Sequence, residues 1–220
     1  MARLPRLVIP GLAHYVLLQG HNQQRVVMDE KDQRALIEAL REATAARHVV
    51  VHAYAVLDSA VHLLLRPQTA QALSSSMQNL GRRYVARFNQ RHLRTGTLWD
   101  GRFRAAALEP GAVTLAALRR IDGLSSQAGG LQARGGGLRD AMRVDPLELW
   151  ALGNTPFERE LAYRALLAQD LPASASMAMD NALRAGRPLG SEEFLGQLAA
   201  LTGRQVRLRP RGRPPLKRAS

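Results

Sequence analysis

The chain has 220 residues, with 31 Lys or Arg against 18 Asp or Glu, and it contains no Cys. This composition excludes a disulfide scaffold, a thiolate metal site and a cysteine nucleophile, whereas the net charge of +13 favours a polyanionic partner. No stretch approaches the roughly 18 apolar residues of a membrane span, and the apolar run that ends at Pro10 is too short for a secretory signal. We therefore expect a cytoplasmic, nucleoid-associated protein without a membrane partner.

The first half of the chain alternates between strand-like and helical patterns. β-branched apolar runs predict strands, and apolar residues that recur every three or four positions predict helices. In chain order we expect a short strand and turn bracketed by His14–Gln19 and Arg25–Met28, a helix Asp32–Arg47, strands Val49–Val56 and Val61–Leu65, a helix Thr69–Arg94, a strand Leu98–Leu108 and a helix beginning with Leu115–Leu124. The order β-α-β-β-α-β-α predicts an α+β fold, a ferredoxin-like split βαβ sheet covered on one face by helices.

The second half is expected to hold shorter helices. Thr155 and Ser191 each stand before residues typical of a helix start, and glycine pairs and triplets near residue 130 indicate a break. We expect an α+β domain over 1–131, a Gly/Arg-rich linker over 132–144, a helical C-terminal region over 145–202 and a basic, disordered tail over 203–220.

The positive charge is concentrated in two parts of the chain. Residues 1–110 carry 15 basic and 8 acidic side chains, and residues 203–220 carry 7 basic and none acidic, whereas the section between them is near neutral. Nucleic acid is the partner that best fits such blocks.

Four arginines of the expected long helix form one ridge, because they are spaced by four, four and three residues: Arg83, Arg87, Arg91 and Arg94. No acidic residue lies between Thr69 and Thr97, so no salt bridge within the helix explains the ridge, and we expect it to follow DNA phosphates. Arg82 adjoins this ridge. The alternative is a solvated helix face.

Further DNA contacts are expected beyond this helix. Arg102 and Arg104 alternate outward from the next strand, and Trp99 either stacks on an unpaired base or belongs to the core. The tail contains Arg211-Gly212-Arg213-Pro214, which matches the core of an AT-hook, although phosphate binding by the whole tail is the simpler interpretation. The tail residues expected to contact DNA are Arg209, Arg211, Arg213, Lys217 and Arg218.

Several motifs in this order resemble one family. They are Pro5-Arg6-Leu7-Val8 with His14-Tyr15-Val16, Val51-His52-Ala53-Tyr54, Val61-His62-Leu63-Leu64, Gly81-Arg82-Arg83-Tyr84 with Phe88-Asn89, Arg94-Thr95-Gly96-Thr97-Leu98-Trp99-Asp100-Gly101-Arg102, and Leu152-Gly153-Asn154-Thr155-Pro156-Phe157-Glu158. This set resembles the REP-associated tyrosine transposases, a branch of the single-tyrosine HUH transposases.

The resemblance implies a chemistry. Members bind single-stranded DNA beside imperfect hairpins, and a helix-borne tyrosine attacks a phosphodiester. Two histidines of a His-hydrophobic-His strand hold Mg²⁺ or Mn²⁺, usually with a third polar ligand from the tyrosine's helix. Such a metal polarises the phosphoryl oxygen, and two residues at i and i+2 reach it from one face of a strand.

This chain departs from the pattern at three of four positions. The first histidine falls on Ala60, the nucleophile position on Arg120 and the third-ligand position on Leu124, so that only His62 remains. A lone imidazole is a poor site for a hard cation. We therefore expect a DNA-binding homologue that has lost most of its catalytic centre and needs no cofactor, with Mg²⁺ or Mn²⁺ involved only where activity remains.

Two other functions stay open. The first is metal-dependent strand transfer by displaced residues, such as Asp58 with His62 and a different tyrosine, for example Tyr84. The second is an RNA-binding regulator, since ferredoxin-like sheets also bind RNA. The DNA target, which is expected to be a hairpin or a repeat, and the oligomeric state do not follow from the sequence.

Overall fold

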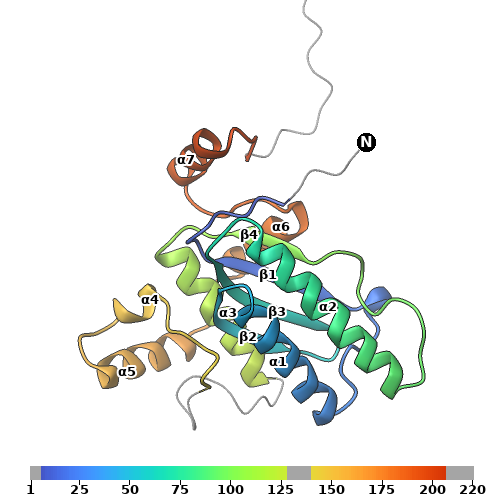
Figure 1. Ribbon diagram of the computed structural model, residues 1–220. Helices are drawn as coiled ribbons and strands as arrows, with labels where there is room; N and C mark the ends of the chain where they lie inside the picture. Colours follow the sequence, from blue (N-terminus) through green and yellow to red (C-terminus); the bar gives the residue numbers. More distant parts are fainter. Residues whose placement is uncertain (1–5, 128–139, 207–220) are drawn as a thin grey trace, which may run out of the picture.

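The computed structural model describes residues 6–127 and 140–206. Its centre is one antiparallel sheet in the strand order β2-β3-β1-β4, which is the order of a ferredoxin-like split βαβ fold (Figure 1). The elements are β1 (His14–Gln19), η1 (His21–Gln23), α1 (Glu30–Ala45), β2 (Val49–Val56), β3 (Ala60–Pro67), α2 (Ala72–Arg91), β4 (Arg104–Ala107), α3 (Ala112–Gln127), α4 (Leu147–Trp150), α5 (Pro156–Leu167), α6 (Ala173–Ala185) and α7 (Glu192–Thr202). The predicted α+β class is confirmed.

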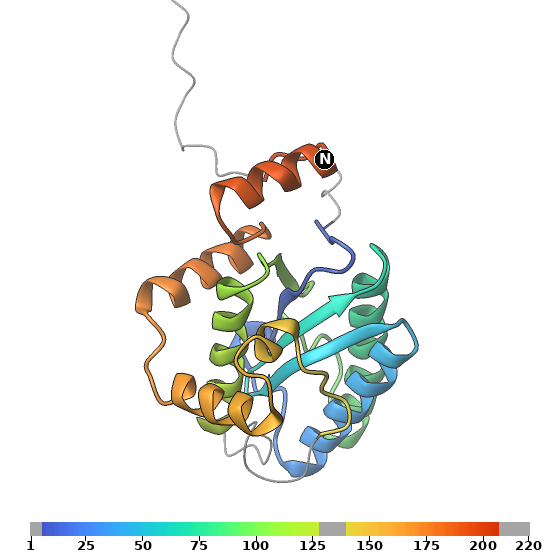
Figure 2. The ribbon, with the colours of Figure 1, turned by 90° about the vertical axis from the view of Figure 1, so that its left-hand side faces the viewer.

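Helices cover both faces of the sheet, not one. Neighbouring side chains of a strand point to opposite faces, and both Tyr15 and Val16 of β1 are fully buried. Val16 packs in a cluster with α1 and α2, whereas Tyr15 packs in a second cluster with α3 and the C-terminal helices (Figure 2). The prediction of one covered face is wrong because it treated the C-terminal helices as an appendage, although they supply part of the second layer.

The helices α1 and α2 form as their sequences predict. The Asp29 carboxylate caps α1 by accepting the backbone N–H groups of Lys31 and Asp32 at 2.9 and 3.0 Å. The apolar stripe of α2, from Leu73 to Phe88, is buried against the sheet and α1. Both helices begin and end within three residues of the expected positions.

Two strand predictions are corrected. Strand β4 covers only Arg104–Ala107 instead of Leu98–Leu108, because the chain bends at Gly101, whose φ of +67° is left-handed, and Trp99 forms only an isolated bridge with Gly20. Residues 25–28 form a loop, although Val26 is buried and its N–H donates to the Asp58 carbonyl at 2.6 Å.

The C-terminal helices α4, α5 and α6 pack beside α3, and α7 covers a smaller cluster that includes Ile9 and Val206. Thr155 and Glu158 form a capping box at the predicted start of α5, and the Ser191 hydroxyl accepts the Phe194 N–H at the start of α7. Within 6–127 and 140–206, no helix is long and apolar enough to cross a membrane. Most of the predicted linker and tail lies outside the described residues.

Candidate nucleic-acid interface

A closed polar cluster lies where β1, β3, α3 and α6 meet. The Tyr15 hydroxyl and His62 Nδ1 share a hydrogen bond of 2.9 Å, and the Arg120 guanidinium lies 5.7 Å from the centre of the Tyr15 ring. Arg120 in turn donates to the Asp180 carboxylate at 2.7 Å and to the Ser176 carbonyl at 3.1 Å. The helix α6 therefore holds Arg120 over the face of the sheet that carries His62.

Burial controls the ionisation of this cluster. Desolvation, followed by the positive charge of Arg120, lowers the pKa of His62 to about 4, so that the imidazole is neutral at pH 7. Desolvation raises the pKa of the Tyr15 hydroxyl well above its usual value. Tyr15 is fully buried, so neither water nor DNA reaches its oxygen. Nδ1 of His62 is thus paired with a tyrosine hydroxyl.

None of the four tyrosines of the chain presents its hydroxyl to solvent. Their exposed fractions are 3% or less, and each hydroxyl has a hydrogen-bond partner in the protein. Besides the Tyr15–His62 bond, Tyr54 donates to Asp140 at 2.7 Å, Tyr163 donates to Asp122 at 2.8 Å, and Tyr84 donates to the Val26 carbonyl.

The displaced residues considered in the sequence do not converge. Asp58 lies in the turn between β2 and β3, where its carboxylate is exposed and pairs with Arg25 at 3.1 Å. Tyr84 belongs to the core beneath α2, with its ring centre 6.1 Å from that of Trp99. Asp58 and Tyr84 thus have partners of their own, away from the His62 cluster.

The arginine ridge of α2 faces α1, which supplies the acidic partners that α2 lacks. Arg83 pairs with Glu42, and Arg91 pairs with Asp29 and with Asp32, whose side chain is only 3% exposed. Two of the four ridge arginines therefore have acidic partners on a neighbouring helix, which the absence of acidic residues within α2 does not reveal.

The other members of the ridge are less tightly held. Arg87 is exposed and makes no ion pair with any described residue. Arg94 donates to the Gln24 side chain at 2.6 Å. Among the four ridge arginines, Arg87 is thus the one available to a phosphate.

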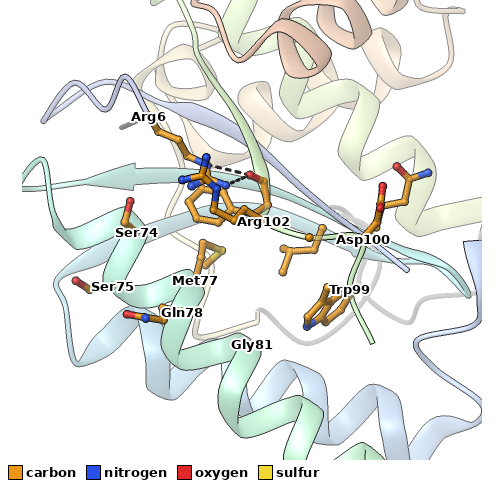
Figure 3. A pocket seen from close by; sticks show the side chains of 13 residues that line it. Arg6, Ser74, Ser75, Met77, Gln78, Gly81, Trp99, Asp100 and Arg102 are labelled. Carbon is orange, nitrogen blue, oxygen red and sulfur yellow. Dashed lines mark hydrogen bonds between the residues drawn. The ribbon is translucent and has the colours of Figure 1, made fainter. Parts of the chain in front are cut away.

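A groove of about 460 Å³ lies on the opposite flank of α2 (Figure 3). One wall is α2, the other is the loop before β4, and Leu18 and Gln19 of β1 contribute to its lining. Arg82, one helical turn beyond the lining residue Gln78, is exposed at this flank. The remaining residues of the lining are Arg6, Ser74, Ser75, Met77, Gly81, Trp99, Asp100, Gly101, Arg102 and Phe103.

Trp99 combines the two roles considered in the sequence. Its indole is 8% exposed and packs in the core beside Tyr84, yet it also lines the groove. Arg102 is exposed at the groove, whereas Arg104 begins β4 and lies 3.5 Å from the Asp100 carboxylate. The predicted tail contacts Arg209, Arg211, Arg213, Lys217 and Arg218 lie outside the described residues.

Comparison with known proteins identifies the first half of the chain. Residues 12–120, from just before β1 into α3, match the family described as IS200-like transposases. The chain belongs to the IS200-like transposase family. It is a DNA-binding transposase homologue.

Two solved structures are similar to this transposase homologue. A REP-associated tyrosine transposase bound to a REP hairpin is 17% identical, with a TM-score of 0.48 over 59% of this chain and 76% of that one. A predicted transposase from Deinococcus radiodurans is 22% identical, with a TM-score of 0.38 over 50% and 88%. A search among curated proteins finds no significant match.

The transposase positions that the resemblance assigns to a metal do not fit one. The side chains of Ala60 and Leu124 carry no ligand atom, and Nδ1 of His62 is engaged by Tyr15. Within the described ranges, no group of three His, Cys, Asp or Glu side chains is close enough to hold a metal ion. One imidazole is a poor match for Mg²⁺ or Mn²⁺, which prefer oxygen ligands, and the nearby Asp180 carboxylate is paired with Arg120.

The sequence did not reveal the groove of this transposase homologue, nor the ion pair between Asp180 and Arg120. The local signal for the groove was present: Ser74, Ser75 and Gly81 are unfavourable inside a helix, and residues that break a local rule often mark functional sites. The Arg120–Asp180 pair joins residues 60 positions apart, which no local pattern reveals.

Proposed function

We propose that this IS200-like transposase homologue recognises hairpin or single-stranded DNA without cleaving it. The choice of hairpin or single-stranded DNA follows from the resemblance of its motifs to those of the REP-associated tyrosine transposases. The loss of cleavage follows from its own residues. It would therefore act by occupying a repeat sequence, needing neither Mg²⁺ nor Mn²⁺.

The burial of all four tyrosines carries this proposal. A tyrosine nucleophile must bring its oxygen within contact of a phosphorus atom, and each hydroxyl here is covered and hydrogen-bonded. The position that the family pattern gives to the nucleophile holds Arg120, which is cationic at every physiological pH and pairs with Asp180. A cation at this position can attract a phosphate but cannot attack one.

The DNA surface that we propose runs along the groove flank of α2. Arg82 and Arg102 are exposed there and make no ion pair with a described residue, whereas Arg83 and Arg91 are engaged with α1. Arg87 and the basic tail add further phosphate contacts. Each lost contact with a phosphate of a single strand lowers the slope of log K against log salt by about 0.7. Measuring this slope for single-residue variants therefore maps the surface residue by residue.

The experiment is a binding titration followed by fluorescence anisotropy. A DNA hairpin with an unpaired 5′ extension, a blunt duplex and an RNA hairpin of the same sequence are compared at several salt concentrations. We expect the extended DNA hairpin to bind most tightly. We also expect the double variant Arg82→Gln with Arg102→Gln to weaken binding and to flatten its salt dependence.

The matched control is the double variant Arg34→Gln with Arg41→Gln in α1, which removes two exposed arginines that pair with Glu30 and Glu38, away from the groove. Equal loss in this control would show that net charge alone governs binding. Preferential binding of the RNA hairpin would favour the RNA-binding regulator over our proposal. Release of a cut strand in the presence of Mn²⁺ would contradict the loss of cleavage.

A further inference from the structure

The groove beside α2 contains a polar group that the protein leaves unused. The Trp99 Nε1–H is buried and has no hydrogen-bond partner among the described residues. Most buried polar groups in proteins are paired, so an unpaired donor at a cavity indicates a missing acceptor. Trp99 is held firmly: its carbonyl accepts from the Thr97 hydroxyl at 3.0 Å, and the following N–H donates to the Gln19 carbonyl at 2.7 Å.

Gly81 leaves space in front of this donor. It lies in the middle of α2, where glycine is unfavourable relative to alanine, yet a Cβ placed there would meet only Trp99 Nε1, at 3.9 Å. The fold therefore has room for alanine at this position. Figure 3 shows the indole edge turned toward Gly81. The glycine leaves the space beside the indole N–H without a side chain.

The remaining lining suits a flat aromatic ligand with a phosphate. Trp99 and Met77 offer apolar surface, Gln78 offers a side-chain amide, and the exposed Arg102 offers a guanidinium with no ion pair to a described residue. A volume of about 460 Å³ lies within the range of small-ligand sites and accommodates one nucleotide. Base edges carry acceptor atoms, and unpaired bases readily contact aromatic side chains.

We propose that this groove is the binding site for one unpaired nucleotide, whose base accepts the Trp99 N–H and whose phosphate contacts Arg102. This inference rests on the proposed recognition of DNA and adds to it a single position at which a base is held. It also explains why the groove flank of α2 carries small polar residues in place of a continuous apolar or charged surface.

The decisive variant is Gly81→Ala, because it should raise the stability of the protein while lowering its affinity for the extended hairpin. Replacing a mid-helix glycine raises stability, which for a chain of this size corresponds to about 1–4 °C in Tm. The new methyl group covers the indole N–H, so affinity for the hairpin with the unpaired extension should fall about tenfold, whereas affinity for the blunt duplex should not change. A defect in folding cannot produce this combination.

Gly123→Ala in α3 is the matched control, since a Cβ there meets nothing within 4 Å. It should gain similar stability without a change in affinity. Trp99→Phe removes the N–H while keeping an aromatic ring, and it should lose about as much affinity as Gly81→Ala. Trp150→Phe leaves Trp99 as the single tryptophan, whose fluorescence should be quenched by the extended hairpin and not by the duplex.

The nucleotide site and the recognition of DNA can be refuted separately. If the unmodified protein binds the extended hairpin and both Gly81→Ala and Trp99→Phe bind it equally well, the nucleotide site is wrong and DNA recognition stands. If the unmodified protein binds no DNA, the proposed function and the nucleotide site are both wrong.

Discussion

Replacing Arg91 by methionine separates the structural role of the α2 ridge from a role in DNA binding. The Arg91 guanidinium donates to Asp29 at 2.8 Å and also to the buried Asp32. Methionine keeps the apolar stem of the side chain and removes its charge. Asp32 then retains the Met28 N–H at 3.0 Å and His92 Nε2 at 2.8 Å.

The expected cost is about 2 kcal/mol. Breaking a buried ion pair completely costs about 3–5 kcal/mol, but Asp32 keeps two partners and the Arg91 side chain is 33% exposed, which reduces the loss. In a chain of this length, about 2 kcal/mol corresponds to a fall of roughly 4–8 °C in Tm.

The pH dependence of this loss has a definite sign. Burial alone would raise the pKa of Asp32, but hydrogen bonds from Met28, Arg91 and His92 outweigh it and hold the pKa below its usual value. A lowered carboxyl pKa stabilises the fold above the pKa of the unfolded chain, near 4, and this contribution disappears as the pH falls through the lowered value. The difference between Arg91→Met and the unmodified protein should therefore shrink below about pH 4.

The assay is urea unfolding at pH 7 and below pH 4, together with hairpin binding at pH 7. The matched variant Arg87→Met lies one helical turn away on the same ridge, is exposed and breaks no ion pair with a described residue. We expect Arg91→Met to lose stability while keeping DNA affinity, and Arg87→Met to show the reverse. If Arg91→Met left stability unchanged and weakened binding, the ridge would be a DNA surface after all.

Three further predictions concern other parts of the molecule. Burial lowers the pKa of both His14 and His62 to about 4, so the unfolded chain binds these protons first and stability should fall from pH 7.5 to pH 5. His14 should account for about 2 kcal/mol of this loss, and His14→Gln should remove that part alone in parallel denaturation curves. Deleting 207–220, which spares the buried Val206, removes six basic residues and should lower the slope of log K against log salt by up to about 4; an unchanged slope would exclude the tail from binding. Thermal melts should show no rise in Tm with millimolar Mn²⁺, and a rise that depends on His62 would indicate a metal site.

The fold followed from the sequence because its signals are local. The strand Val49–Val56 was predicted to the residue, since its apolar β-branched run ends at a clear turn. The strand β1 lies in the segment that was expected to hold a short strand and a turn. The capping residues Thr155 and Ser191 fixed two helix starts. The second helical layer was missed, because a helix such as α6 does not specify in its own sequence which surface it covers.

The site was only partly predictable, because several of its contacts join residues that are far apart in the sequence. The absence of a histidine at position 60 and of a tyrosine at position 120 is visible in the sequence alone. The pairing of Arg83 and Arg91 with α1 depends on how two helices pack, and so does the burial of all four tyrosine hydroxyls. Likewise, Trp99 appeared as either a core residue or a base contact, whereas its ring lies in the core and its N–H lies at the groove.

The central claim is that this IS200-like transposase homologue holds DNA without forming a covalent bond to it. The most direct test is the intact mass of the protein after incubation with an excess of extended hairpin and Mn²⁺, under conditions where anisotropy shows the complex to be saturated. We predict only the unmodified mass. An added mass equal to a DNA fragment, lost when one of the four tyrosines is replaced by phenylalanine, would contradict the account.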